Sequence, residues 1–271
     1  MKIAASGWSK SALMALIAAG AAATLRADAI VATYDAATVQ AATGATLCGT
    51  ATKCDIGEET FNSWNGTVPY TSTYSTSLDD VGGLTGSFTG TYTGSLTESN
   101  TYEWGGAGGT GYYPTVTNST YTLNLAVSGT IPGVNYFGLW LSALDAENEI
   151  QLYNGTTLVY TFTAAQIIAT MGACPSGTNP YCGNPNNRQD TNEQFAFLNL
   201  YDETGFFTKV VFTEPDSSGL ESDNHTVGYI STIKPIGTTY YTNTPEPSPL
   251  VLLSVGILAL TGLRRRSRRG C

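Results

Sequence analysis

Two short acidic segments carry the side chains best suited to binding chemistry in this sequence. They are Asp145-Ala146-Glu147-Asn148-Glu149 and Glu221-Ser222-Asp223-Asn224, each beside a stretch patterned like a β-strand. Carboxylate and amide oxygens are the ligands that calcium takes, about six to eight at a time. The spacing is not that of an EF-hand loop, so solvated acidic loops are the alternative. We predict a calcium site at these strand ends, with ligands Asp145, Glu147, Glu221, Asp223 and Asn224.

Catalytic chemistry has few candidates. The chain has one histidine, His225, and histidine is the side chain whose ordinary pKa lies nearest neutrality. The sequence contains no G-x-S-x-G segment that would present a serine nucleophile on a strand-to-helix turn. Glu193, Glu214 and Glu221 are eligible as paired carboxylates of a glycosidase, as is any surface acid. We therefore predict no catalytic residues, with a secreted hydrolase acting on polysaccharide as the alternative.

Two other patterns resemble binding motifs. Gly106–Gly111 matches G-x-G-x-x-G, which binds dinucleotides only between a strand and a helix; Tyr112-Tyr113-Pro114 follows here, so we predict a flexible loop. Alternate threonines and serines at 71–77 and 85–97 resemble hydroxyl rows that order water on ice-binding surfaces. No fixed-period repeat supports a flat array, and threonine on a solvent-facing strand is ordinary. Ice binding remains an alternative function.

The charge distribution excludes one class of partner. Residues 30–244 hold four of the 12 basic residues and 19 of the 21 acidic ones, so they carry a net charge of −15. A surface this acidic repels phosphate backbones, so we predict no nucleic-acid partner. It attracts cations instead.

Four cysteines lie in the body of the chain, and a fifth, Cys271, is the last residue. An even number in an exported domain indicates disulfides, with three possible connectivities. We favour the local pairs Cys48–Cys54 and Cys174–Cys182, which close short, turn-rich loops. A zinc site is the rival, but the spacing contains no C-x2-C pair.

The elements that must position these residues are mostly strands. Residues 84–97 alternate apolar or glycine with hydroxyl side chains, which indicates one long strand or two joined at a glycine. Further strands are predicted at 121–128, 136–143, 149–153, 157–162, 195–201, 208–213 and 226–233, with a hairpin turn at Asn154-Gly155. Thr163 to Gln166 is a capping box that begins a two-turn helix, which ends at Gly172.

This pattern predicts an all-β fold, an antiparallel β-sandwich with one short helix. Residues 30–243 form the single extracellular domain. We predict that residues 238–244 form a linker.

The N-terminus has the features of a secretory signal peptide. Lys2 and Lys10 precede an apolar run over 11–23, and small residues follow. Ala27-Asp28-Ala29 fits an A-x-A cleavage site, so we predict a signal peptide over 1–29; cleavage after Ala27 fits nearly as well.

The C-terminus carries a second predicted targeting signal, over 244–271. Pro245-Glu246-Pro247 precedes an apolar run over 250–263, and a cluster beginning Arg264-Arg265-Arg266 follows. Fourteen residues make a helix of about 21 Å at 1.5 Å per residue, short for a membrane, although arginines can extend its reach. The arginines place the end of the chain in the cytoplasm.

This combination resembles the PEP-CTERM sorting signal of bacterial surface proteins. The resemblance implies that an exosortase removes the tail near Pro245-Glu246-Pro247, after the helix has held the chain transiently in the inner membrane. It also implies export to the cell surface or to an exopolysaccharide matrix.

The stretch from Asn135 to Ile230 resembles a family of exosortase-dependent surface proteins. The matching segments are 136–145, 150–155, 195–199 and 219–228. The resemblance implies an extracellular jelly-roll domain of the kind that also serves as a carbohydrate-binding module. We therefore expect a non-enzymatic protein that adheres to glycan or matrix, with a purely structural matrix component as a further alternative.

Overall fold

The computed structural model describes residues 28–100 and 104–243, with the side chains of 75–80 left aside, and residues 28–243 form one compact unit. The predicted sorting signal over 244–271 lies outside the described residues, and so does the predicted signal peptide apart from Asp28 and Ala29.

None of the helices in the described ranges is long and apolar enough to cross a membrane.

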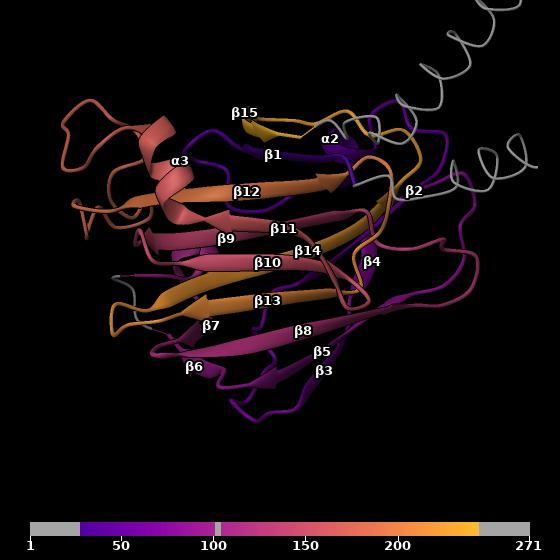
Figure 1. Ribbon diagram of the computed structural model, residues 1–271, viewed down its shortest axis with the longest axis horizontal. Coiled ribbons are helices and arrows are strands. Elements are labelled where there is room, and N and C mark those ends of the chain that lie inside the picture. Colours follow the sequence, from indigo (N-terminus) through magenta and orange to yellow (C-terminus); the bar gives the residue numbers. More distant parts are fainter. Residues whose placement is uncertain (1–27, 101–103, 244–271) are drawn as a thin grey trace, which may run out of the picture. The chain divides into compact units, whose positions relative to one another are not determined.

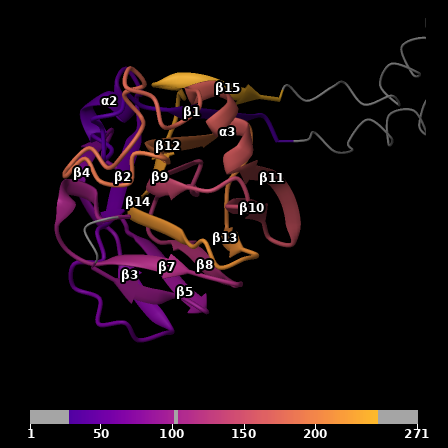
Figure 2. The same ribbon diagram turned by 90° about the vertical axis from the view of Figure 1, so that its left-hand side faces the viewer.

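Two antiparallel sheets make up the unit (Figures 1 and 2). The six-stranded sheet has the order β11 (Thr157–Thr163), β10 (Glu149–Asn154), β13 (Lys209–Glu214), β8 (Ser119–Val127), β5 (Phe88–Gly94) and β3 (Tyr70–Thr73). The nine-stranded sheet has the order β15 (Thr238–Thr242), β1 (Ile30–Tyr34), β12 (Gln194–Asp202), β9 (Tyr136–Leu144), β14 (Leu220–Ile230), β2 (Cys54–Glu59) and β4 (Ser75–Val81), while β7 (Tyr113–Val116) pairs with β14 and with β6 (Thr97–Ser99). This confirms the predicted all-β, antiparallel architecture of two sheets.

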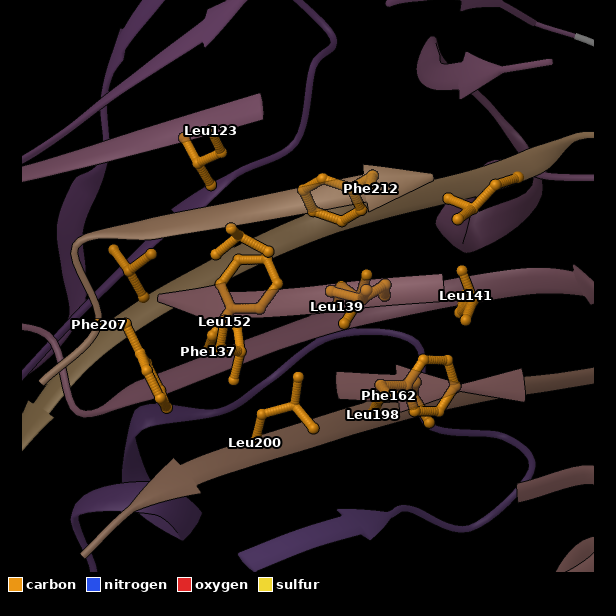
Figure 3. Packing of buried hydrophobic residues seen from close by; sticks show 14 of the residues in the cluster. Leu123, Phe137, Leu139, Leu141, Leu152, Phe162, Leu198, Leu200, Phe207 and Phe212 are labelled. Carbon is orange, nitrogen blue, oxygen red and sulfur yellow. The ribbon is translucent and has the colours of Figure 1, made fainter. Parts of the chain in front are cut away.

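The main core lies between the two sheets (Figure 3). Leu139 and Leu198 come from the nine-stranded sheet, Leu152 and Phe212 come from the six-stranded sheet, and all four are fully buried. Period-two alternation puts one face of each six-stranded-sheet strand into this core and leaves the other face in water.

The nine-stranded sheet is covered on its outer face as well. Trp140, Phe195 and Tyr201 belong to a second buried cluster, together with Cys48 from helix α2 (Gly44–Cys48). Every residue of β9 and of β12 is consequently buried. Burial on both faces explains why apolar residues predominate at every second position and at the positions between them in these two strands.

Helix α3 (Ala164–Met171) begins with the predicted capping box, in which the Thr163 N–H donates to the Gln166 side chain. It packs against β11 and β15 at one edge of the sandwich, and buries Ile167 and Met171. The linker predicted over 238–244 is wrong for 238–242, which pair with β1 as strand β15. Burial of Tyr240 and Tyr241 against Phe162 and Tyr160 holds this strand in place.

The six predicted strands between 121 and 213 are present within two residues of their expected ends. The pattern over 84–97 divides instead into β5 and β6, which belong to different sheets. The division comes at Gly94, whose φ of 101° suits glycine. The strand predicted over 226–233 starts earlier, because β14 begins at Leu220.

The early part of the chain holds elements that the sequence pattern did not reveal. These are β1, β2, β4, β7, α2 and the 3-10 turn η1 (Ala107–Gly109). Both predicted disulfides, Cys48–Cys54 and Cys174–Cys182, are present and confirm the favoured pairing.

Candidate functional site

The acidic segment at 221–224 lies inside a strand and not in a loop at its end. The Ser222 hydroxyl hydrogen-bonds Tyr121 of the opposite sheet at 3.0 Å, so Ser222 points into the core. Glu221 and Asp223 point the other way, since strand side chains alternate. Only 9% of Glu221 and 3% of Asp223 is exposed. The prediction of acidic strand-end loops is therefore wrong for this segment, although it is right for Asp145 and Glu147, which follow β9.

Glu221 lies in an environment that opposes its negative charge. Burial, followed by the charges of Asp145, Glu193 and Glu214, raises the pKa of Glu221 to about 8. Asp145 is the one other predicted calcium ligand that acts on Glu221 electrostatically. Burial also raises the pKa of Asp145, with contributions from Asp216, Glu147 and Asp190.

Asp223 and Asn224 hold a neighbouring loop. The Asp223 carboxylate accepts the Ala107 N–H at 2.8 Å and the Asn224 N–H at 2.7 Å. The Asn224 side-chain amide donates to the Gln40 carbonyl at 2.9 Å. Burial raises the pKa of Asp223 to about 7 against these hydrogen bonds. A bulge makes the geometry possible, because Asn224 has a φ of 49° and the register with β9 shifts between Asp223 and Thr226.

Across the part of the chain that the structure describes, no group of three or more histidine, cysteine, aspartate or glutamate side chains is arranged to hold a metal ion. The five predicted ligands form two groups. Glu221, Asp145 and Glu147 are linked by electrostatic interactions, through Asp145. Asp223 and Asn224 lie at the loop that contains Ala107. Calcium binding stays a prediction.

His225 belongs to a hydrogen-bonded chain in the core. Its Nε2 lies 3.0 Å from the Ser222 hydroxyl and its Nδ1 lies 3.1 Å from the Tyr92 hydroxyl. Tyr92 bonds Tyr74 at 2.6 Å, and Ser222 bonds Tyr121. The chain joins the two sheets through hydroxyl groups.

The His225 ring is also enclosed by aromatic rings. Phe212 stacks on it with a centroid distance of 5.1 Å, and Phe61 meets it edge-on at 4.9 Å. None of its surface is exposed, and burial lowers its pKa to about 3. The imidazole is therefore neutral at physiological pH, and its hydrogen bonds stabilise the contact between the sheets.

A shallow groove lies over the glycine-rich segment that resembled a nucleotide-binding motif. It has a volume of about 230 Å³ and is lined by Asn100, Gly105, Gly106, Gly109, Thr110, Gly111, Tyr112 and Tyr113. All of these side chains are uncharged. No helix of the dinucleotide-binding kind follows the segment, since β7 begins at Tyr113.

Glycine is required here by close approach as well as by backbone angles. Gly109 and Gly111 have φ values of 72° and 94°. A Cβ on Gly109 would lie 2.8 Å from the Asn186 side chain, and a Cβ on Gly111 would lie 1.9 Å from the Asn62 amide oxygen. The Gly108 N–H donates to the Gln40 side chain at 2.7 Å. Together with the Asp223 contact, these neighbours hold the loop in one shape.

Two aromatic side chains stand out of this loop into solvent. Trp104 is 41% exposed and Tyr112 is 39% exposed; among the large hydrophobic side chains described, just Val127 and Leu158 are comparably exposed. Tyr112 lines the groove, and Trp104 precedes the lining residue Gly105. Neither residue was predicted as a binding residue from the sequence, although aromatic residues on either side of a glycine run are a usable signal.

The threonine rows divide between the two sheets. Thr71 and Thr73 lie opposite Thr91 and Thr89 in the six-stranded sheet, whereas 75–77 belong to β4 in the other sheet. Thr93 in turn faces Thr122 on β8. Ice binding stays a prediction.

Comparison of the chain with protein-family models, with curated proteins and with solved structures found no match.

Proposed function

We propose that this protein is an exported, exosortase-processed adhesion protein that binds glycan at the cell surface or in an exopolysaccharide matrix. It acts without catalysis, and its sandwich is a jelly-roll-like scaffold for binding. The signal-peptide pattern and the Pro245-Glu246-Pro247 tail support export and processing, and two disulfides fit an oxidising compartment.

The observation that carries the binding proposal is the groove that exposed Tyr112 lines, with exposed Trp104 next to the lining residue Gly105 in the chain. Leaving large aromatic rings in water is unfavourable, so exposed aromatics beside a groove mark a binding surface. A sugar ring has an apolar face of C–H groups that packs on an aromatic ring, and hydroxyl groups at its edge that hydrogen-bond.

The groove offers both kinds of contact. Tyr112 supplies an aromatic face, while Asn100, Thr110 and the backbone of the glycines supply donors and acceptors. Amphipathic aromatic rings and a few polar groups are the usual lining of small-ligand sites. The hydrogen bonds from the loop to Asp223 and Gln40 preorganise the groove, which reduces the entropy lost on binding.

The test is retention of purified protein on the exopolysaccharide of the producing cells. We expect Trp104→Ala and Tyr112→Ala each to weaken binding about tenfold or more, since aromatic anchors contribute over about 1 kcal/mol. Both residues are exposed, so thermal stability should be unchanged.

The matched control is Leu158→Ala, which removes an equally exposed apolar side chain from β11. It should bind like the unchanged protein. Failure of the unchanged protein to be retained, or equal losses in all three variants, would overturn the proposal.

A further inference from the structure

The residues just before β1 belong to the folded unit. Ala29 is 6% exposed. Its N–H donates to the Thr204 hydroxyl at 2.9 Å, and its carbonyl accepts the Glu203 N–H at 2.8 Å. A mature chain cleaved after Ala29 would lose both hydrogen bonds and the packing of this residue.

A chain that began at Ile30 would also place its α-ammonium at a buried position. Ile30 is fully buried, and its N–H donates to the Asn243 side chain at 2.6 Å. β1 lies between β12 and β15, so both of its edges are paired. An ammonium there would be a charge among apolar groups with one hydrogen-bond acceptor for three protons, which is unfavourable.

Next to Ala29 lies a carboxylate oxygen that lacks a partner. Asp202 is fully buried; its Oδ1 accepts the N–H groups of Thr204 and Gly205, but its Oδ2 has no hydrogen bond. A Cβ built on Gly205 would lie 2.7 Å from Asp202 Oδ2 and 2.7 Å from Asp28 Oδ1. The two carboxylate oxygens are thus no more than 5.4 Å apart, since both lie that close to one point.

A buried carboxylate and a half-buried one this close together favour a positive charge between them. Burial raises the pKa of Asp202, and the charge of Asp28 adds to the effect. A buried polar atom without a partner is unfavourable and rare in folded proteins. Asp202 also lines a hollow of about 200 Å³ whose other lining residues include Asn135 and Thr204, so its surroundings are polar.

We propose that the mature protein begins at Asp28, and that the α-ammonium created there pairs with the carboxylates of Asp202 and of Asp28 itself. The inference rests on the proposed export. In the cleavage, signal peptidase uses water to hydrolyse the bond between Ala27 and Asp28. Hydroxide adds to the Ala27 carbonyl carbon, and the nitrogen of Asp28 leaves with a proton and is then protonated to the ammonium. Ala27 is the small residue directly before the cleaved bond, whereas Leu25, three positions before the bond, is larger than the A-x-A pattern has there.

Signal peptidase acts before the chain folds, so the fold does not select the bond. Cleavage after Ala27, however, retains Ala29 and its two hydrogen bonds and places a cation beside the unpaired oxygen. Cleavage after Ala29 removes both advantages.

The first test is the intact mass and N-terminal sequence of the protein recovered outside the inner membrane. We expect a chain that begins Asp28-Ala29-Ile30. A start at Ile30 would overturn this inference and leave the export proposal standing. Recovery of the chain only in its uncleaved form, beginning at Met1, would overturn the export proposal and this inference with it.

The second test is the pKa of the α-amino group in that mature protein, from the pH dependence of its reaction with an acylating reagent. An ordinary α-amino group has a pKa of about 7.7–8.0. We expect a higher value, because opposite charges within about 4–6 Å favour the ammonium. In Asp202→Asn the value should fall by about one pH unit.

Glu203→Gln is the matched control, because Glu203 adjoins Asp202 but is exposed. It should leave the pKa of the α-amino group near that of the unchanged protein. An α-amino group that begins at Asp28 but titrates identically in Asp202→Asn would overturn the pairing.

Discussion

The free energy of unfolding should decrease as the pH rises from about 4.5 to 8, and Glu221 should be a main cause. Burial raises the pKa of Glu221 from 4.5 in the unfolded chain to about 8 in the folded protein. Between these values the folded state keeps a proton that the unfolded state has released. Stability falls with pH wherever the folded state binds more protons, so the contribution of Glu221 is unfavourable above its unfolded pKa and reaches its full size above the folded one.

The size of the effect follows from the same two values. Each difference of one in pKa corresponds to about 1.4 kcal/mol, so ionising Glu221 removes about 4 kcal/mol of stability between pH 5 and pH 8. For a domain of this length, about 1 kcal/mol shifts Tm by roughly 2–4 °C. Glu221 alone therefore accounts for a fall in Tm of about 10 °C. Asp223, whose pKa burial raises to about 7, acts in the same direction.

The assay is a thermal melt of the unchanged protein and of Glu221→Gln at pH 5 and pH 8. Glutamine has the shape of the protonated glutamate and cannot ionise. We expect similar Tm values at pH 5 and a Tm for Glu221→Gln about 10 °C higher at pH 8. Glu147→Gln, which changes an exposed carboxylate near the same acidic cluster, should show no such gain.

Parallel pH profiles for the unchanged protein and Glu221→Gln would refute this reasoning. They would mean that the charge of Glu221 is already solvated or paired in the folded state.

Three further predictions concern calcium, processing and the disulfides. Calcium at about 100 times its Kd should add about 2.7 kcal/mol to the free energy of unfolding and raise Tm by roughly 5–10 °C at pH 8, and magnesium should do less. Identical thermal melts with EDTA, calcium and magnesium would exclude the predicted ligands, and so would a calcium-dependent shift that is unchanged in Asp223→Asn. Mass spectrometry of the extracellular protein should find no residues beyond about 247, whereas an intact tail in the membrane of a strain with active exosortase would argue against processing. Cys48→Ser should lower Tm more than Cys174→Ser, because Cys48 is 3% exposed and Cys174 is only half-buried. Equal losses would count against this difference.

Much of the fold was predictable because most strands follow simple rules. In β10, β11 and β13, alternate residues are buried and the others are exposed or half-buried, as period-two patterning requires. The capping box at Thr163 and the hairpin at Asn154-Gly155 are local signals that tertiary contacts did not override. Short separation in sequence likewise made both disulfides predictable.

The candidate groove was harder to predict, because exposure is a property of the assembled fold. Residue type alone does not distinguish Trp104, which is 41% exposed, from Trp140, which is 1% exposed. The glycines at 106–111 indicated a loop. The reason that glycine is needed there is the close approach of Asn62 and Asn186, which lie far away along the chain. The groove exists because these side chains meet the loop over the nine-stranded sheet.

The sequence by itself determined the strand-rich character of the chain, its cysteine pairs and the patterns at both ends, because each depends on residues close together along the chain. Only the tertiary structure decided that Glu221, Asp223 and His225 are buried. The polarity of Glu221 and Asp223 suggested an exposed strand end, but a bulge after Asp223 carries β14 onward between β9 and β2. The outer face of the sheet is covered there by the loop at Ala107, and the inner face by the opposite sheet. Hydrogen bonds that become available only after these layers meet allow such polar residues to be buried.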